Sequence, residues 1–177
     1  MRVLGAVLAG GQSSRFGSDK AEALLHGRPL LAHALEQLRR HVTSVVVVGR
    51  QTDLAPSAVD WPRPGEGPLG GIAGAFHYAE SEGFKWVLSV PVDALSLPDD
   101  LLSALSPGPA CLGEQPVIGL WPVSAAQILD ELLAGDGRKS MFAFAEAIGA
   151  RRVSVSSHPA NINTVADLVQ LEQRNGI

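Results

Sequence analysis

The sequence has a single cysteine, no long hydrophobic run and no signal-peptide pattern, and each of these shortages excludes a class of protein. Cys111 has no second cysteine with which to form an internal disulfide, which is typical of a reducing compartment. No apolar stretch approaches the roughly 18 residues that a membrane span requires. The first residues run directly into glycines, without a small-residue cleavage site after a long apolar region. We therefore expect a cytoplasmic protein with no membrane partner.

The chain also lacks an excess of positive charge. Its 14 lysines and arginines stand against 18 acidic residues, and the densest basic spots are the pairs Arg39–Arg40 and Arg151–Arg152. Because nucleic-acid-binding domains carry a basic patch or stripe, no nucleic-acid partner is expected. The five histidines show no metal-binding spacing. Cys111 is expected to be a small core residue.

Strand and helix patterns alternate along a chain that is long enough for one core. At 177 residues, a single domain spanning 1–177 is expected. The predicted strands are 3–8, 45–48, 86–90, 109–112, 116–121 and 151–155. The predicted helices are 29–40, 68–80, 99–105, 124–134, 140–148 and 164–173, and capping-box spacing marks the starts at Ser124 and Thr164. This alternation predicts an α/β fold, a three-layer sandwich around a mostly parallel sheet.

A glycine-rich segment follows the first predicted strand directly. It reads Leu8-Ala9-Gly10-Gly11-Gln12-Ser13-Ser14-Arg15-Phe16-Gly17-Ser18-Asp19-Lys20. Ligands of open parallel sheets bind beyond the carboxyl ends of the strands, where glycines let backbone N–H groups approach phosphate oxygens. The segment has neither the Walker A pattern nor the dinucleotide fingerprint. A turn with solvated charges would also fit, but the added charges of Arg15 and Lys20 favour phosphate binding.

The pattern Leu-Ala-Gly-Gly-x-Ser-x-Arg-Phe-Gly-x-Asp-Lys-Ala, followed by Gly27-x-Pro29-Leu30, resembles a known family signature. It is similar to that of nucleotidyltransferases with a Rossmann-like fold of the nucleotide-diphospho-sugar transferase type, and most similar to the molybdenum cofactor guanylyltransferases. The resemblance covers nearly the whole chain. It implies catalytic roles for Arg15, Lys20 and Asp93, and GTP binding by Leu8, Ala9, Gly10, Gly11 and Lys20.

Gly67-Pro68-Leu69-Gly70-Gly71 matches the turn that shapes the nucleobase pocket in this family. The resemblance therefore implies GTP binding by Gly67, Pro68 and Leu69. Asp60 stands seven residues before the turn, where the guanylyl enzymes have an aspartate. Its carboxylate could accept hydrogen bonds from N1–H and N2–H₂ of guanine, which cytosine cannot match. The alternative is a helix start with proline in its first turn, and a solvated aspartate.

Asp93 follows the predicted strand 86–90, in Ser89-Val90-Pro91-Val92-Asp93. The family's metal-binding and nucleotide-binding aspartate falls on this position. A carboxylate at this edge suits Mg²⁺, which usually takes one or two carboxylates together with phosphate oxygens and waters. An aspartate in this context can also simply form a turn, but the neighbouring phosphate loop favours the metal.

Three further segments are assigned to the acceptor side. Residues 115–120 resemble the strand that lines this side in the family. Asn161 and Asn163 match the Asn-x-Asn-Thr thought to contact the molybdopterin, although Asn163 or Thr164 could instead cap the last helix. The basic loop 135–140 could meet the acceptor's phosphate or be a solvated turn. Val48 and Glu22 depart from the family pattern, which leaves the details of base recognition open.

The resemblance implies transfer of GMP from GTP to the phosphate of molybdenum-bound molybdopterin, with release of pyrophosphate. Mg²⁺ is the expected cofactor, and apoenzymes or delivery proteins that receive the product are possible partners. The acceptor phosphate has a second pKa near ~6, so it is largely ionised at neutral pH and needs no strong general base. A CTP-dependent relative and a sugar-phosphate nucleotidyltransferase are alternatives. A non-catalytic adaptor that binds nucleotide or delivers cofactor is an alternative of another class.

Overall fold

The computed structural model describes residues 1–11, 19–157 and 164–175. A seven-stranded sheet has the order β5-β4-β1-β6-β8-β7-β9. Its strands are β1 (Val3–Leu8), β4 (Ser44–Val48), β5 (Ser57–Ala58), β6 (Trp86–Pro91), β7 (Ala110–Leu112), β8 (Gly119–Pro122) and β9 (Arg151–Val153). A separate hairpin joins β2 (Leu24–Leu25) to β3 (Arg28–Pro29). The helices are α1 (Leu30–Arg39), α2 (Gly67–Ser81), α3 (Leu101–Leu105), α4 (Ala126–Ala134), α5 (Met141–Ala147) and α6 (Val165–Asn175), with 3-10 turns η1 (Lys20–Glu22) and η2 (Val123–Ala125).

Strand β1 lies between β4 and β6 and pairs with both in parallel. The chain therefore passes from β1 to one side of the sheet and later to the other, which makes β1 a topological switch point. In open α/β sheets, the crevice beyond the carboxyl ends of such strands is where ligands bind. Strand β8 runs antiparallel to both of its neighbours, β6 and β7. The prediction of a mostly parallel sheet is confirmed.

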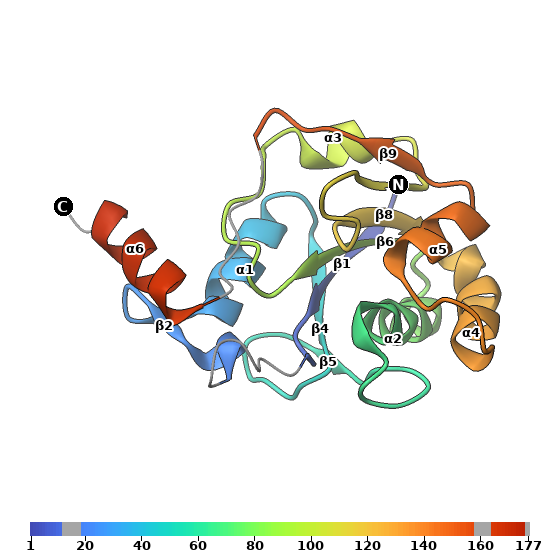
Figure 1. Cartoon of the computed structure of the whole chain (residues 1–177), viewed down its shortest axis with the longest axis horizontal. Helices are drawn as coiled ribbons and strands as arrows, with labels where there is room; N and C mark the ends of the chain where they lie inside the picture. The colour runs from blue at the N-terminus through green and yellow to red at the C-terminus, as the bar shows by residue number, and fades with distance from the viewer. Residues whose placement is uncertain (12–18, 158–163, 176–177) are drawn as a thin grey trace.

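Helices cover both faces of the sheet and complete three layers (Figure 1). Helices α1 and α3 pack on one face, and α2, α4 and α5 pack on the other. The four valines of β4 show how one strand serves both cores. Val45 and Val47 are buried against the α1 side, whereas Val46 and Val48 are buried against the α2 side. A run of β-branched residues is typical of a strand buried on both faces, as the sequence predicts.

The last helix begins with the predicted capping box. The Thr164 N–H donates to Asp167 Oδ2 at 2.9 Å, and the Asp167 N–H donates to Thr164 Oγ1 at 3.1 Å. Helix α6 lies beside the β2–β3 hairpin, at one end of the molecule (Figure 1). Its Leu168 joins a small apolar cluster with Leu25 and Leu30. Thr164 therefore provides one of the two caps that the sequence allowed.

Several predicted boundaries are wrong: the helix predicted over 99–105 begins at Leu101, and the strand predicted over 151–155 ends at Val153. Local contacts explain two further differences. Helix α4 begins at Ala126 without a side-chain cap, because the chain leaves β8 through η2, in which Ser124 takes part. Gln127, the other end of the supposed capping box, donates to Glu131 instead, at 3.0 Å. The strand predicted over 116–121 begins only at Gly119, because the Ile118 N–H donates to the Gln115 carbonyl and closes a turn.

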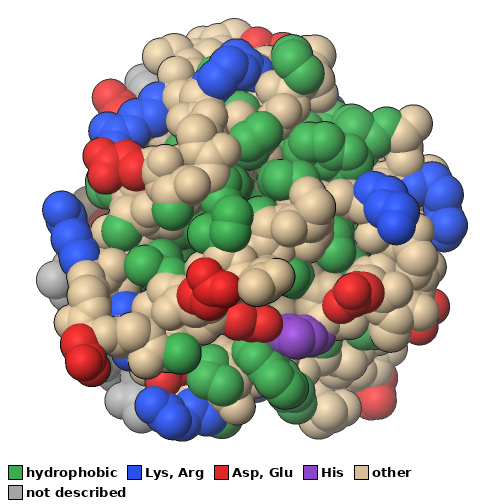
Figure 2. All heavy atoms as spheres, turned by 90° about the vertical axis from the view of Figure 1, so that its right-hand side faces the viewer, with side chains coloured by type: hydrophobic (Ala, Val, Ile, Leu, Met, Phe, Trp, Pro, Cys, Tyr) green, Lys and Arg blue, Asp and Glu red, His purple; other side chains and the backbone are tan. Residues whose placement is uncertain are grey.

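The distribution of charge on one face of the molecule agrees with the near balance of acidic and basic residues in the sequence (Figure 2). The face that carries α4 and α5 has acidic and basic side chains scattered around apolar ones, with no basic stripe among the residues drawn in colour (Figure 2). Within the described ranges, no helix combines the length and the hydrophobicity needed to cross a bilayer.

Candidate nucleotide-binding site

The loops that follow β1, β4 and β6 converge at one edge of the sheet. Gly10 follows β1 and Gly49 follows β4, and their backbones touch. A Cβ placed on Gly49 would lie 2.5 Å from Gly10 Cα, and the φ of Gly49 is +95°. Both the contact and the left-handed backbone require glycine at this position. The close approach brings the first glycine segment against the loop of the neighbouring strand.

Asp60 lies over this pair of glycines. Its Oδ2 is 2.9 Å from the place where a Cβ on Gly10 would stand. The N–H of the next residue, Trp61, donates to the Gly70 carbonyl at 3.0 Å and so ties the segment to α2. Asp60 is half-buried, burial raises the pKa of its carboxyl group, and no described residue is hydrogen-bonded to it. A carboxylate in this state is an acceptor available to a ligand.

A cavity of about 500 Å³ opens beside Asp60. This volume falls within the range of small-molecule sites. Its lining includes Leu8, Gly10, Gly11, Asp60, Gly67 and Pro68. The structure thus gathers the first glycine segment, the predicted base-binding aspartate and the start of α2 around one space. Leu69 is buried in the core on this side of the sheet and is not part of the lining.

A second cavity of about 200 Å³ adjoins the first and shares Leu8, Gly11 and Pro91 with it. Here Lys20 Nζ lies 2.9 Å from Asp93 Oδ2, and the two side chains are 17% and 14% exposed. Lys20 begins η1, whereas Asp93 follows β6, 73 residues later. The two charged residues predicted from separate motifs therefore meet in one cavity, which Ala9 also lines.

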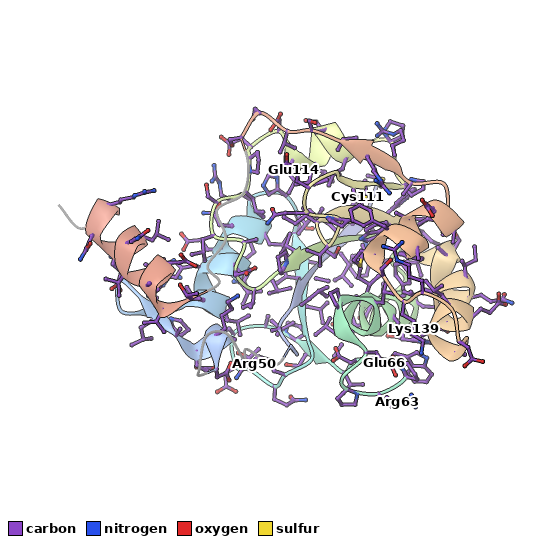
Figure 3. All side chains as sticks on the ribbon, in the orientation of Figure 1. Arg50, Arg63, Glu66, Cys111, Glu114 and Lys139 are labelled. Atoms are coloured by element: carbon purple, nitrogen blue, oxygen red, sulfur yellow. The ribbon has the colours of Figure 1, made fainter. Side chains whose placement is uncertain are left out.

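Sequence reasoning missed Arg50, which follows Gly49 at the end of β4. Its Nη1 donates to Asp19 Oδ1 at 2.8 Å, and its Nη2 donates to Asp19 Oδ2 at 2.6 Å. These hydrogen bonds lower the pKa of the Asp19 carboxyl group and raise the pKa of Arg50. Figure 3 shows Arg50 beside the segment that carries η1. An arginine two residues after a buried strand was the only local signal.

A buried hydrogen-bond chain fixes the opposite wall of the larger cavity. The Trp121 indole N–H donates to Ser89 Oγ at 2.8 Å, and Ser89 Oγ donates to the Val117 carbonyl at 2.6 Å. Ser89 is fully buried within β6, and Val117 lines the cavity from the turn before β8. Ser89 therefore joins the sheet core to the turn that closes the site.

Ser89→Ala should lower the free energy of unfolding by about 2 to 4 kcal/mol, because it leaves a buried indole N–H without its partner and removes the donor to Val117. Denaturant unfolding followed by fluorescence measures this change. Ser103→Ala is the control, since the Ser103 hydroxyl donates to the Asp100 carbonyl at an exposed position. If both variants lose equally little stability, the buried chain contributes nothing special.

The remaining predicted residues fall into two groups. Arg15, Asn161 and Asn163 lie outside the described residues. In the loop 135–140, Arg138 and Lys139 are exposed, and Ser140 accepts from the Ala143 N–H at 3.1 Å and caps α5.

Cys111 is a buried free thiol in the core, as predicted. Val48 is also fully buried, so its side chain cannot contact a base.

This arrangement can be compared with known proteins. The family model described as the MobA-like NTP transferase domain matches residues 5–154. The chain belongs to this family. A molybdenum cofactor guanylyltransferase of Acidiphilium cryptum is 36% identical over 176 residues, covering 92% of this chain and 90% of that protein. Another of the same name, from Rhizobium leguminosarum, is 34% identical over 195 residues, covering 97% and 92%.

A solved structure has the same fold as this MobA-like chain. The molybdopterin-guanine dinucleotide biosynthesis protein A of Archaeoglobus fulgidus superimposes with a TM-score of 0.70 at 22% identity. The match covers 98% of each chain. The sheet, the helices on both of its faces and the α6 end of the chain thus follow a fold already seen in this group. The α/β class predicted from the sequence is confirmed.

Proposed function

We propose that this MobA-like protein transfers GMP from GTP to the phosphate of molybdenum-bound molybdopterin and releases pyrophosphate. The observation that carries the proposal is the pair of adjoining cavities at the carboxyl edge of β1. One holds the Asp60 carboxylate, and the other holds Lys20 and Asp93. The names of the two relatives support the same reaction.

The larger cavity suits the guanine base. Guanine offers N1–H and N2–H₂ on one edge, and the two oxygens of Asp60 can accept from both. The carboxylate is not satisfied by any described residue, so binding a base costs no internal hydrogen bond. Cytosine has only one such donor group beside an acceptor nitrogen, and that nitrogen would face a carboxylate oxygen. The site therefore favours GTP over CTP.

The smaller cavity suits the triphosphate. Lys20 can donate to phosphate oxygens, and Gly11, which lines both cavities, lets a backbone N–H group come close. We also propose that Asp93 binds Mg²⁺, since a single carboxylate with phosphate oxygens and waters is a usual magnesium site. Asp93 fits this role because its Oδ2 accepts from Lys20, whereas its Oδ1 accepts no hydrogen bond from any described residue. The bound ion would supply charge neutralisation on the triphosphate.

The reaction is a displacement at the α-phosphorus of GTP. An oxygen of the acceptor phosphate forms a new bond to that phosphorus, and the bond to the bridging oxygen breaks, so that pyrophosphate leaves with the electron pair. The acceptor is already largely ionised at neutral pH, so no proton needs to be removed. The chain's contribution is then positioning and charge neutralisation, with Lys20 on the phosphates. We also propose that Arg15 helps to neutralise the charge on the phosphates, and that Asn161 and Asn163 bind the pterin.

Calorimetry with GTP and CTP in the presence of Mg²⁺ tests the base assignment. GTP should bind more tightly by ~2 kcal/mol, the scale of hydrogen bonds to a charged group, or about thirtyfold. Asp60→Asn should reduce GTP affinity but not CTP affinity, because the asparagine amide can donate to the acceptor nitrogen of cytosine. Because burial raises the pKa of Asp60, the preference should also weaken as the pH falls through that raised value and the carboxylate is protonated.

Asp53→Asn is the matched control, because Asp53 is an exposed aspartate that lies between β4 and β5, outside the lining of both cavities. It should leave both affinities unchanged. Equal binding of CTP by the wild-type protein would overturn the guanylyl assignment and favour a CTP-dependent enzyme. Pyrophosphate release on addition of the acceptor separates an enzyme from an adaptor that only binds nucleotide.

A further inference from the structure

Arg50 and Asp19 form a two-pronged ion pair beside the smaller cavity. Both terminal nitrogens of Arg50 bond separate oxygens of Asp19, at 2.8 and 2.6 Å. The Arg50 side chain is only 20% exposed. Paired, parallel hydrogen bonds of this kind fix orientation as well as distance, which a lysine cannot do. Glu22 also lies 3.3 Å from Arg50 Nη2, but it makes a single contact, whereas Asp19 makes two; both carboxylates are more than half exposed.

The ion pair joins loops from neighbouring strands. Arg50 belongs to the loop after β4, and Asp19 immediately precedes Lys20 in the segment after β1. Asp19 Oδ1 also accepts from the Ala21 N–H at 3.2 Å and caps η1. The start of the turn that presents Lys20 is therefore held through Asp19, which caps η1 and also binds an arginine from the loop after another strand.

We propose that Arg50 is a positioning residue for the nucleotide triphosphate. Its guanidinium holds Asp19, the capped turn holds Lys20, and the Lys20 ammonium is thereby kept in the cavity that also contains Asp93. Arg50 is not among the residues that line either cavity. It acts through Lys20, without touching the ligand. The inference rests on the proposed role of Lys20 with phosphate, but not on the identity of the base.

The variant Asp19→Asn separates positioning from a simple effect of charge, because the two predict opposite changes in triphosphate affinity. Asp19→Asn removes a negative charge near the phosphates, which on charge alone should strengthen triphosphate binding. Asparagine caps helices as well as aspartate does, so η1 keeps its cap. Only the two-pronged pair with Arg50 is lost. If that pair positions Lys20, Asp19→Asn should weaken triphosphate binding.

The experiment measures the dissociation constants of GTP and guanosine by calorimetry with Mg²⁺. Arg50→Lys and Asp19→Asn should each raise the dissociation constant of GTP by about tenfold or more, the scale for residues that orient a ligand-binding group. Guanosine should bind as it does to the wild type, because it has no phosphate for Lys20. A loss of fold would weaken both ligands together, so the GTP-to-guanosine ratio isolates positioning from stability.

Two controls match these changes. Glu22→Gln removes the same charge beside Arg50 without breaking the pair, and Arg28→Lys makes the same replacement in an exposed ion pair with Glu36. Both should keep the wild-type ratio. In a Lys20→Ala background, Arg50→Lys should cause no further loss. A full additional loss would overturn the proposal, as would tighter GTP binding by Asp19→Asn.

Failure of the proposed function gives a different result. If the wild-type protein prefers CTP, the guanylyl assignment is wrong, and the comparison of CTP with cytidine still tests Arg50. If GTP is preferred but the variants keep the wild-type ratio of triphosphate to nucleoside affinity, Arg50 has only a structural role.

Discussion

Asp93→Ala is expected to reduce GMP transfer by about a thousandfold, the scale at which removal of one charge-stabilising group slows a reaction. Asp93 follows β6 and lines the smaller cavity, and we propose that it binds Mg²⁺ there. Without it, the charge on the triphosphate is neutralised less and pyrophosphate is a poorer leaving group. A steady-state assay of pyrophosphate release measures the loss.

The variant also removes the partner of Lys20, so folding must be measured together with turnover. Asp93→Asn is the second variant, because its amide oxygen can still accept from Lys20 although it is a poorer magnesium ligand. In both variants, added Mg²⁺ should no longer strengthen GTP binding in calorimetry. Asp99→Ala, at an exposed aspartate paired with Arg40, is the control. Near-normal transfer by folded Asp93→Ala would remove Asp93 from the reaction.

The sequence predicts the parts of the fold that depend on burial along a local segment. Residues 45–48 are an example, because four successive valines can be satisfied only by a strand with cores on both faces. The switch point at β1 could not be predicted in this way, since strand order depends on pairing between distant segments. The direction of β8 was equally invisible, because a short apolar run has the same pattern in either direction. The edge strand β5 has only two residues, too few to show any periodicity.

In the candidate site, too, the sequence predicts residues that belong to local patterns and misses those that depend on tertiary contacts. Lys20 and Asp93 were found because each follows a recognisable pattern at the end of a buried strand, and the fold then brings them to 2.9 Å. Arg50 was missed because its partner, Asp19, lies 31 residues away and no local spacing relates the two. The Ser89–Val117 bond was missed for the same reason. Sequence patterns identified groups that meet a ligand, whereas the groups that hold them in place depend on tertiary contacts.

Lys20→Ala is expected to weaken GTP binding by about tenfold to a hundredfold or more, while guanosine binding stays close to that of the wild type. A hydrogen bond from a charged donor is worth about 1.5 to 3 kcal/mol, which corresponds to this range. The loss should fall at the upper end because Lys20 is only 17% exposed, so water screens its charge only weakly. Calorimetry with both ligands measures the difference.

The controls for Lys20 separate charge, geometry and folding. Lys85→Ala removes a lysine at an exposed position after α2 and should change neither affinity. Lys20→Arg keeps the positive charge but places it on a longer, planar group, so it should recover part of the GTP affinity and little of the turnover. If Lys20→Ala weakens GTP and guanosine equally, its pair with Asp93 serves to hold the two loops together. In that case the smaller cavity would bind phosphate through the backbone of the first glycine segment, and the affinity of Lys20→Ala for GTP would depend on added Mg²⁺ as strongly as that of the wild type.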